Sequence, residues 1–190
     1  MICLNMIVKN EVKVLPRLFA SLHKYISYYS ITDTGSSDGT QALIKELMDG
    51  YGIRGEVHED PWRSDFGYSR QVAMEHALRA AKKEGFSKLL FIDADEELGC
   101  NDPDWVSKLQ PGTSYNIEKH HGGMRYGVPA LVDIRSTQWH WRRPVHNYLE
   151  HVSGPVKWET LFTVFIRFHQ GQGAKSHGVT THQKVCQGLI

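Results

Sequence analysis

The sequence predicts an α/β fold, in which a mostly parallel sheet is flanked by helices. In the first half of the chain, strand-like apolar runs alternate with helix-like segments. This alternation is typical of parallel strands joined by right-handed crossovers. In the second half, strand-like pieces are separated by glycine- and histidine-rich turns, and we expect a smaller antiparallel region there.

The elements of the first half follow from local patterns. Leucines recur at helical spacing in the first expected helix, and aromatic and β-branched residues fill the second expected strand. We expect strands at residues 2–8, 28–33, 55–58 and 89–92, and helices at 14–25, 41–48 and 68–83. After a short helix at 101–109, the strand-like pieces of the second half are 115–118, 130–134 and 162–168.

The central strand runs straight into a group of acids. Leu89–Ile92 is continuously apolar and reads as a strand buried on both faces. Asp93 and Asp95 follow it, separated only by Ala94. Because buried unpaired charges are very costly, the strand must end there, and the acids must lie at the carboxyl edge of the sheet, where open α/β folds bind ligands. Two carboxylates at one point suit Mg²⁺ or Mn²⁺ completed by phosphates and water.

Composition excludes several classes of protein. The chain has 190 residues, 41% of them hydrophobic, and a formal net charge of +1. It lacks the global basic field of nucleic-acid-binding proteins, so we expect no stable nucleic-acid binding. The apolar run at the start is too short to span a membrane, and we expect no transmembrane segment. Three widely spaced cysteines indicate no disulfide framework, and the cytoplasm is the expected compartment. Neither a Walker A sequence nor a Gly-x-Gly-x-x-Gly fingerprint occurs.

Four segments stand in an order that resembles a known family. They are Ile7–Glu11 after the first strand, Ile31–Thr40 after the second, Phe66–Gln71 at the start of a helix, and Phe91–Glu96 at the end of the central strand. Together they resemble the GT-A-type, nucleotide-sugar-dependent glycosyltransferases, in which Asp-x-Gly-Ser-x-Asp-Gly-Thr and Asp-x-Asp are signature segments. A weaker likeness covers Arg143–Glu150.

The resemblance implies a GT-A-like fold and a domain organisation. It implies one glycosyltransferase domain at residues 1–170, with a nucleotide-binding half at 1–99 and an acceptor-side half at 100–170. A loose tail would follow at 171–190. The function implied is metal-dependent transfer of a sugar from a nucleotide sugar, with a UDP sugar favoured, to an unknown acceptor and with inversion.

The same resemblance implies a set of site residues. Those expected at the nucleotide sugar are Val8, Glu11, Asp33, Gly35, Ser36, Arg70, Asp93, Ala94 and Asp95. Asp95 would bind Mn²⁺ or Mg²⁺ between the two phosphates, with Asp93 and His146 as further ligands. A cation at this place stabilises the charge that develops on a departing diphosphate.

The catalytic base is the point at which this chain departs from the family. An inverting transfer needs a base to take the acceptor proton. Where the family often has Glu after the His, this chain has Asn147, which cannot be a base. Glu150, Asp133 and His146 are the candidates that remain. Two alternatives therefore stay open: a nucleotide- or carbohydrate-binding module of the same fold without turnover, and a sugar nucleotidyltransferase.

Overall fold

The computed structural model describes residues 1–135 and 137–169. The first half contains β1 (Ile2–Val8), α1 (Leu15–Leu22), β2 (Tyr28–Asp33), α2 (Thr40–Gly50), β3 (Arg54–Glu59), α3 (Phe66–Glu84) and β4 (Lys88–Phe91). The second half contains β5 (Glu96–Cys100), a short 3-10 helix (Trp105–Lys108), β6 (Thr113–His121), β7 (Met124–Asp133), β8 (Gln138–Arg142), β9 (Tyr148–Ser153) and β10 (Lys157–Phe168). The tail expected at 171–190 lies outside the described residues.

Most of these strands form one large sheet. Its order is β3-β2-β1-β4-β7-β6-β10-β5, and β8 and β9 form a separate two-stranded sheet. β1 pairs in parallel with β2 and β4, and β2 pairs in parallel with β3. β7 is antiparallel to both β4 and β6, and β5 is antiparallel to β10. The expected α/β class, with a mostly parallel sheet and a smaller antiparallel part, is confirmed.

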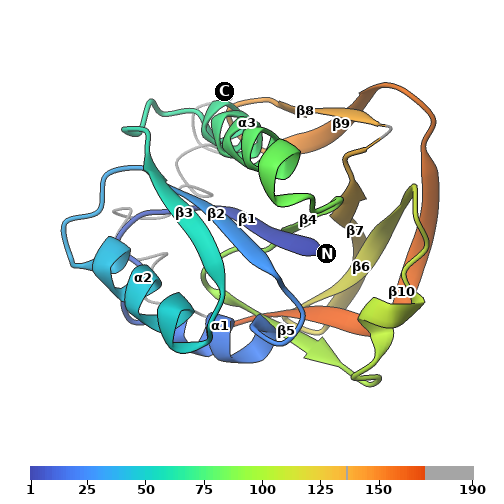
Figure 1. Cartoon of the computed structure of the whole chain (residues 1–190), viewed down its shortest axis with the longest axis horizontal. Coiled ribbons are helices and arrows are strands. Elements are labelled where there is room, and N and C mark those ends of the chain that lie inside the picture. The colour runs from blue at the N-terminus through green and yellow to red at the C-terminus, as the bar shows by residue number, and fades with distance from the viewer. Residues whose placement is uncertain (136, 170–190) are drawn as a thin grey trace.

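Helices cover both faces of the parallel strands. Figure 1 shows α3 on one side of β1 and β2, and α1 and α2 on the other. One apolar cluster joins β1 to α1 through Leu4, Leu18 and Phe19, and a second joins it to α3 through Cys3 and Met74. β1 is therefore buried on both faces, as its continuous apolar sequence predicts.

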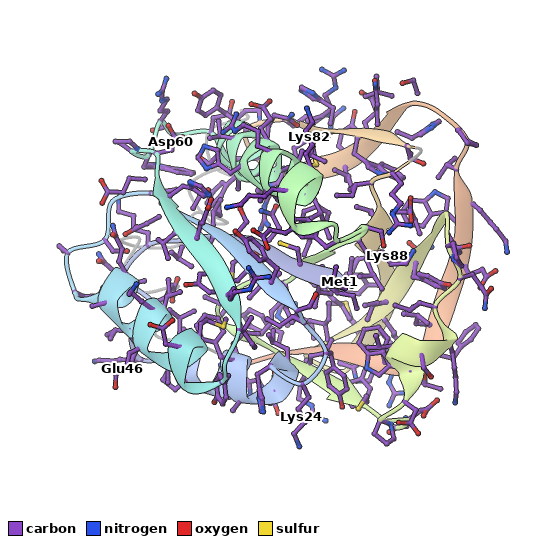
Figure 2. All side chains as sticks on the ribbon, in the orientation of Figure 1. Met1, Lys24, Glu46, Asp60, Lys82 and Lys88 are labelled. Atoms are coloured by element: carbon purple, nitrogen blue, oxygen red, sulfur yellow. The ribbon has the colours of Figure 1, made fainter. Side chains whose placement is uncertain are left out.

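The direction of the parallel strands fixes the two ends of the sheet. Lys88, at the start of β4, pairs with Ile2 at the start of β1, and Figure 2 shows Lys88 and Met1 near each other. The residues that follow β1, β2 and β4 all lie at the opposite, carboxyl edge. In the described part of the chain, no helix is long and apolar enough to cross a membrane.

Candidate active site

The turn after β2 is built around the carboxylate of Asp33. Its Oδ1 accepts hydrogen bonds from the backbone N–H groups of Gly35 (3.0 Å) and Ser36 (2.9 Å), and from the Ser36 hydroxyl (2.8 Å). Gly35 has a φ of 109°, a conformation that glycine adopts without strain. The other oxygen, Oδ2, is buried without a hydrogen-bond partner among the described residues. Because a buried acceptor without a partner is costly, this oxygen is suited to accept a hydrogen bond from a ligand.

The turn after β1 is tied directly to the turn after β2. The N–H of Asn10 donates to Ser36 Oγ at 2.9 Å, and Asn10 Oδ1 accepts from the N–H of Ser37 at 2.8 Å. The N–H of Glu11 donates to Thr40 Oγ1 at 2.9 Å. These contacts fix Glu11 beside the Asp33 turn. They also explain why Asn10, Ser36 and Thr40 are polar residues with short side chains.

The acid turn after β4 is held from α3. Arg70 Nη2 donates to Asp93 Oδ1 at 2.6 Å, and the Arg70 guanidinium lies 5.2 Å from the ring centroid of Trp141. Burial raises the pKa of Asp93, but the positive charges of Arg70 and Lys119 outweigh it, and the pKa lies below its ordinary value. Asp93 is therefore an ionised partner of Arg70, while Asp95 has no such ion pair within the described residues.

The three turns line one cleft of about 170 Å³ at the carboxyl edge. Its walls are Ile7, Val8, Lys9, Glu11, Thr34, Trp62, Phe66, Arg70, Asp93, Ala94 and Asp95. Of the residues expected at a nucleotide sugar, six line this cleft, and Asp33, Gly35 and Ser36 form the turn that continues from Thr34. The structure thus brings all nine together, although the sequence spreads them from residue 8 to residue 95.

Negative charge accumulates at this cleft. Burial, followed by the carboxylates of Asp95, Asp38 and Asp93, raises the pKa of Glu11 to about 7. Burial and the Asp93 carboxylate also raise the pKa of Asp95. The Oε2 atom of Glu11 is buried without a hydrogen-bond partner in the described part of the chain. A cation bound here would relieve the repulsion that these acids exert on one another.

The acids fit a divalent cation only if a ligand completes its coordination. Among residues 1–135 and 137–169, no group of three or more His, Cys, Asp or Glu side chains is arranged to hold a metal ion. Mg²⁺ is commonly held by one or two carboxylates together with substrate phosphates and water. Asp95 matches that requirement, because it lines the cleft and has no ion pair in the described part of the chain. The roles of Asp93 and His146 as further ligands remain predictions.

The β8–β9 turn packs against the start of α3. The N–H of Phe66 donates to the carbonyl of Pro144 at 3.0 Å. A Cβ atom at Gly67 would lie only 2.4 Å from the carbonyl oxygen of Arg143, so this close approach requires glycine. His146 lies in the same turn, with an exposed side chain and a φ of 50°. The turn is therefore next to the Phe66 wall of the cleft.

The structure places Asp133, one of the candidate bases, away from the cleft. Asp133 ends β7, which is antiparallel to β4, and it pairs in register with Lys88 at the start of β4. This places it at the end of the sheet opposite the cleft. Its carboxylate is 1% exposed and accepts hydrogen bonds from Lys88 Nζ (3.4 Å) and the N–H of Gly112 (3.2 Å). Asp133 therefore has a structural role.

Glu150 lies on the outer side of the β8–β9 sheet. Its Oε2 accepts a hydrogen bond from Arg142 Nε at 2.6 Å, and the side chains of Arg142 and Glu150 are 47% and 39% exposed. Trp141 and Leu149, its neighbours along the sheet, pack inward on the α3 side. Because side chains alternate along a strand, Glu150 points away from the face that contacts Arg70.

Sequence reasoning missed several residues of this region. Trp62 and Phe66 form an aromatic wall, with ring centroids 4.6 Å apart. His169 follows β10 and returns to the acid turn. Its N–H donates to the carbonyl of Asp95 at 3.1 Å, and its Nε2 lies 2.5 Å from Glu97 Oε2. The aromatic residues Trp62, shortly before the Phe66–Gln71 segment, and Phe66, its first residue, could have been predicted to line the site. Nothing in the sequence around His169 indicates its position.

Comparison with known proteins identifies the family. A sequence profile described as Glycosyl transferase family 2 matches residues 3–172. The chain belongs to glycosyl transferase family 2. Among curated proteins, it is 36% identical over 97 residues to TPR repeat-containing protein Synpcc7942_0270 of Synechococcus elongatus. That match covers 51% of this chain and 21% of the relative, so the family 2 region aligned here is about a fifth of the relative's length.

Solved structures of S. aureus TarS are also similar to this family 2 chain. One is TarS 1-349 in complex with UDP, with a TM-score of 0.48 and 21% identity over 67% of this chain and 38% of that one. Another, of TarS, has a TM-score of 0.48 and 18% identity, and covers 67% of this chain and 23% of that one.

Proposed function

We propose that this family 2 chain transfers a sugar from a UDP sugar to an acceptor, with inversion and with Mn²⁺ or Mg²⁺ bound at Asp95. The observation that carries the proposal is the convergence of three turns, those of Glu11, Asp33 and Asp95, on one cleft at the carboxyl edge of the sheet. Family membership supports the reaction class, and the charges of the cleft support the cation.

The base and ribose end of the donor would lie at the Asp33 turn. Uracil presents an N–H group between two carbonyls, and the unpartnered Oδ2 of Asp33 is an acceptor for it. Three hydrogen bonds to Oδ1 hold that carboxylate in one orientation before a ligand arrives.

The diphosphate end would lie between Arg70 and Asp95. A divalent cation, when bound, neutralises the charge that develops on the leaving diphosphate. Asp95 would hold that cation together with the phosphates. Arg70 keeps Asp93 ionised and in place, and adds a positive charge to the same wall. Trp62 and Phe66, which also line the cleft, would exclude water from it.

The acceptor side would lie on β6, β7 and β10. A hollow of about 440 Å³ there contains His120, Phe162, Phe165 and Arg167. The rings of His120 and Phe165 stack with centroids 4.8 Å apart, and Phe162 is 87% exposed. Exposed rings with cationic and polar neighbours suit a sugar with a polar substituent. Phe162→Ala should raise the acceptor KM while leaving donor affinity unchanged.

A second candidate function is nucleotide or glycan binding without turnover. It is favoured by Asn147 and by the placement of Asp133 and Glu150, since neither carboxylate reaches the cleft. Incubation of UDP-glucose with the protein and Mn²⁺ distinguishes the two candidate functions. Slow release of UDP supports the transferase, and tight binding without release over hours supports the binding module.

A panel of nucleotide sugars tests the proposal as a whole. Thermal unfolding with UDP, GDP, CMP and dTDP sugars, with and without Mn²⁺, should show the largest stabilisation for a UDP sugar with the metal. Saturation at 100 times Kd adds about 2.7 kcal/mol to the free energy of unfolding. Stabilisation by none of them would remove the proposal. Inversion is tested separately by the anomeric configuration of the product in NMR.

A further inference from the structure

A buried ion pair outside the cleft holds the backbone of the acid turn. Lys119, on β6, places its Nζ 2.5 Å from Oε1 of Glu96, the first residue of β5. The other oxygen, Glu96 Oε2, accepts a hydrogen bond from the N–H of Asp93 at 2.9 Å. The N–H of Glu96 in turn donates to the carbonyl of Asp93 at 3.0 Å. The Asp93–Glu96 turn is thus closed by two hydrogen bonds and anchored to a third element.

This pair is well shielded from water. The side chain of Glu96 is 4% exposed and that of Lys119 is 23% exposed. Neither residue lines the cleft. Both oxygens of Glu96 have partners, so its rotamer and the direction of the Asp93 N–H are fixed together. Lys119 can therefore act on a ligand in the cleft through the position of the acid turn, and its positive charge also lowers the pKa of both Asp93 and Asp95.

Stability alone does not account for a charged pair at this place. Two apolar side chains of similar volume are often neutral or more stabilising than a buried ion pair, because the charges lose their hydration. Glu96 also supplies an acceptor for the backbone N–H of Asp93, which an apolar residue cannot do. The side chain of Asp93 is held independently by Arg70. The turn is therefore fixed in both backbone and side chain from opposite sides.

We propose that Lys119 and Glu96 are positioning residues that set the geometry of the Asp93–Asp95 turn for a divalent cation and a nucleotide diphosphate. This inference rests on the proposed function. Neither residue contacts the ligand, and both act through Asp93 and the peptide that leads to Asp95. The acceptor-side half of the chain, through β6, thereby fixes a part of the donor site.

The test compares three variants with a matched control. Lys119→Met breaks the pair, and the double variant Lys119→Met/Glu96→Leu replaces it with an apolar pair that relieves the buried charge. Lys119→Arg keeps the charge and serves as the conservative rescue. Lys88→Met is the control, because it breaks a buried ion pair with Asp133 at the opposite end of the sheet. Each is measured by thermal unfolding and by calorimetry of UDP with and without Mn²⁺.

We expect Lys119→Met and the double variant to weaken Mn²⁺-dependent UDP binding by about 10-fold or more, the usual effect of removing a partner that orients a metal ligand. Binding of UDP without Mn²⁺ should change much less. Lys119→Arg should restore most of the affinity, and Lys88→Met should lower the unfolding temperature without changing affinity. A double variant that binds UDP and Mn²⁺ as the wild type does would overturn the inference, whatever happens to its stability.

Hydrogen exchange separates this inference from the proposed function. The amide of Asp93 should be protected in the wild type without ligand and should lose protection in the double variant. If wild-type protein bound no UDP, the proposed function would fail, and the exchange rate would still test the turn. Unchanged protection of that amide in the double variant would contradict the positioning role directly.

Discussion

Arg70 and Asp93 form an ion pair with Nη2 and Oδ1 2.6 Å apart, although one belongs to α3 and the other follows β4. The Arg70 guanidinium also lies over the Trp141 ring, which fixes its plane. Arg70 thus joins the acid turn to the β8–β9 sheet. The pair leaves Asp95 and Glu11 as the acids that line the cleft without an ion pair in the described part of the chain.

Replacement of Arg70 should impair catalysis more than folding. Arg70→Met removes a cation beside the proposed diphosphate position and breaks the ion pair with Asp93, and we expect kcat/KM to fall by roughly 100-fold. Arg70→Lys should recover only part of the loss, since an ammonium cannot donate to Asp93 and stack on Trp141 with the same planar geometry. Steady-state kinetics with a UDP sugar measure both. Equal activity of the Lys variant and the wild type would show that charge alone matters.

Glu11 should make stability depend on pH near neutrality. Its pKa is about 7 in the folded chain, against an ordinary value of 4.5. Between these values the native state binds more protons than the unfolded state, so the contribution of Glu11 to stability falls as pH rises through this window. Without ligands, Glu11→Gln should gain stability relative to the wild type between about pH 5 and about pH 8. Urea unfolding at several pH values measures the difference, and a difference that is independent of pH would contradict it.

Glu150→Gln tests whether Glu150 is the catalytic base, as the sequence suggests, or an exposed partner of Arg142, as the structure places it. The resemblance made Glu150 a candidate base, but its carboxylate pairs with Arg142 on the outer face. We therefore expect turnover within about twofold of the wild type, as for an ordinary surface substitution. His146→Ala, in the turn beside Phe66, is the informative partner, and its turnover should fall. A large loss of turnover in Glu150→Gln would restore Glu150 as the base.

The first half of the chain could be predicted from the sequence because its signals are local. The apolar run of β1 and the acids after β4 indicate strands and their ends without knowledge of distant partners. Parallel strands then place all those ends at one edge, so the meeting of Asp33 with Asp95 follows from the fold class. The helices begin and end within a few residues of their expected positions, for example Phe66–Glu84 against 68–83.

The second half could not be derived in this way, because its strand directions depend on long-range pairing. β7 enters the sheet antiparallel to β4, which carries Asp133 to the end away from the cleft. β10 lies between β6 and β5 in the sheet, and the residue after its end, His169, reaches Asp95. Lys119 lies in a strand that looks ordinary in sequence. Its role becomes visible only when β6 and β5 are seen to bury it against Glu96.

The most direct test of the central claim is calorimetry of UDP with wild-type protein and with Asp95→Ala, each in the presence and absence of Mn²⁺. Wild-type protein should bind UDP more than about tenfold tighter with Mn²⁺. Asp95→Ala should keep its unfolding temperature and lose that metal-dependent gain. An Asp95→Ala variant that retains the full gain would contradict the account, because the cation would then be held elsewhere.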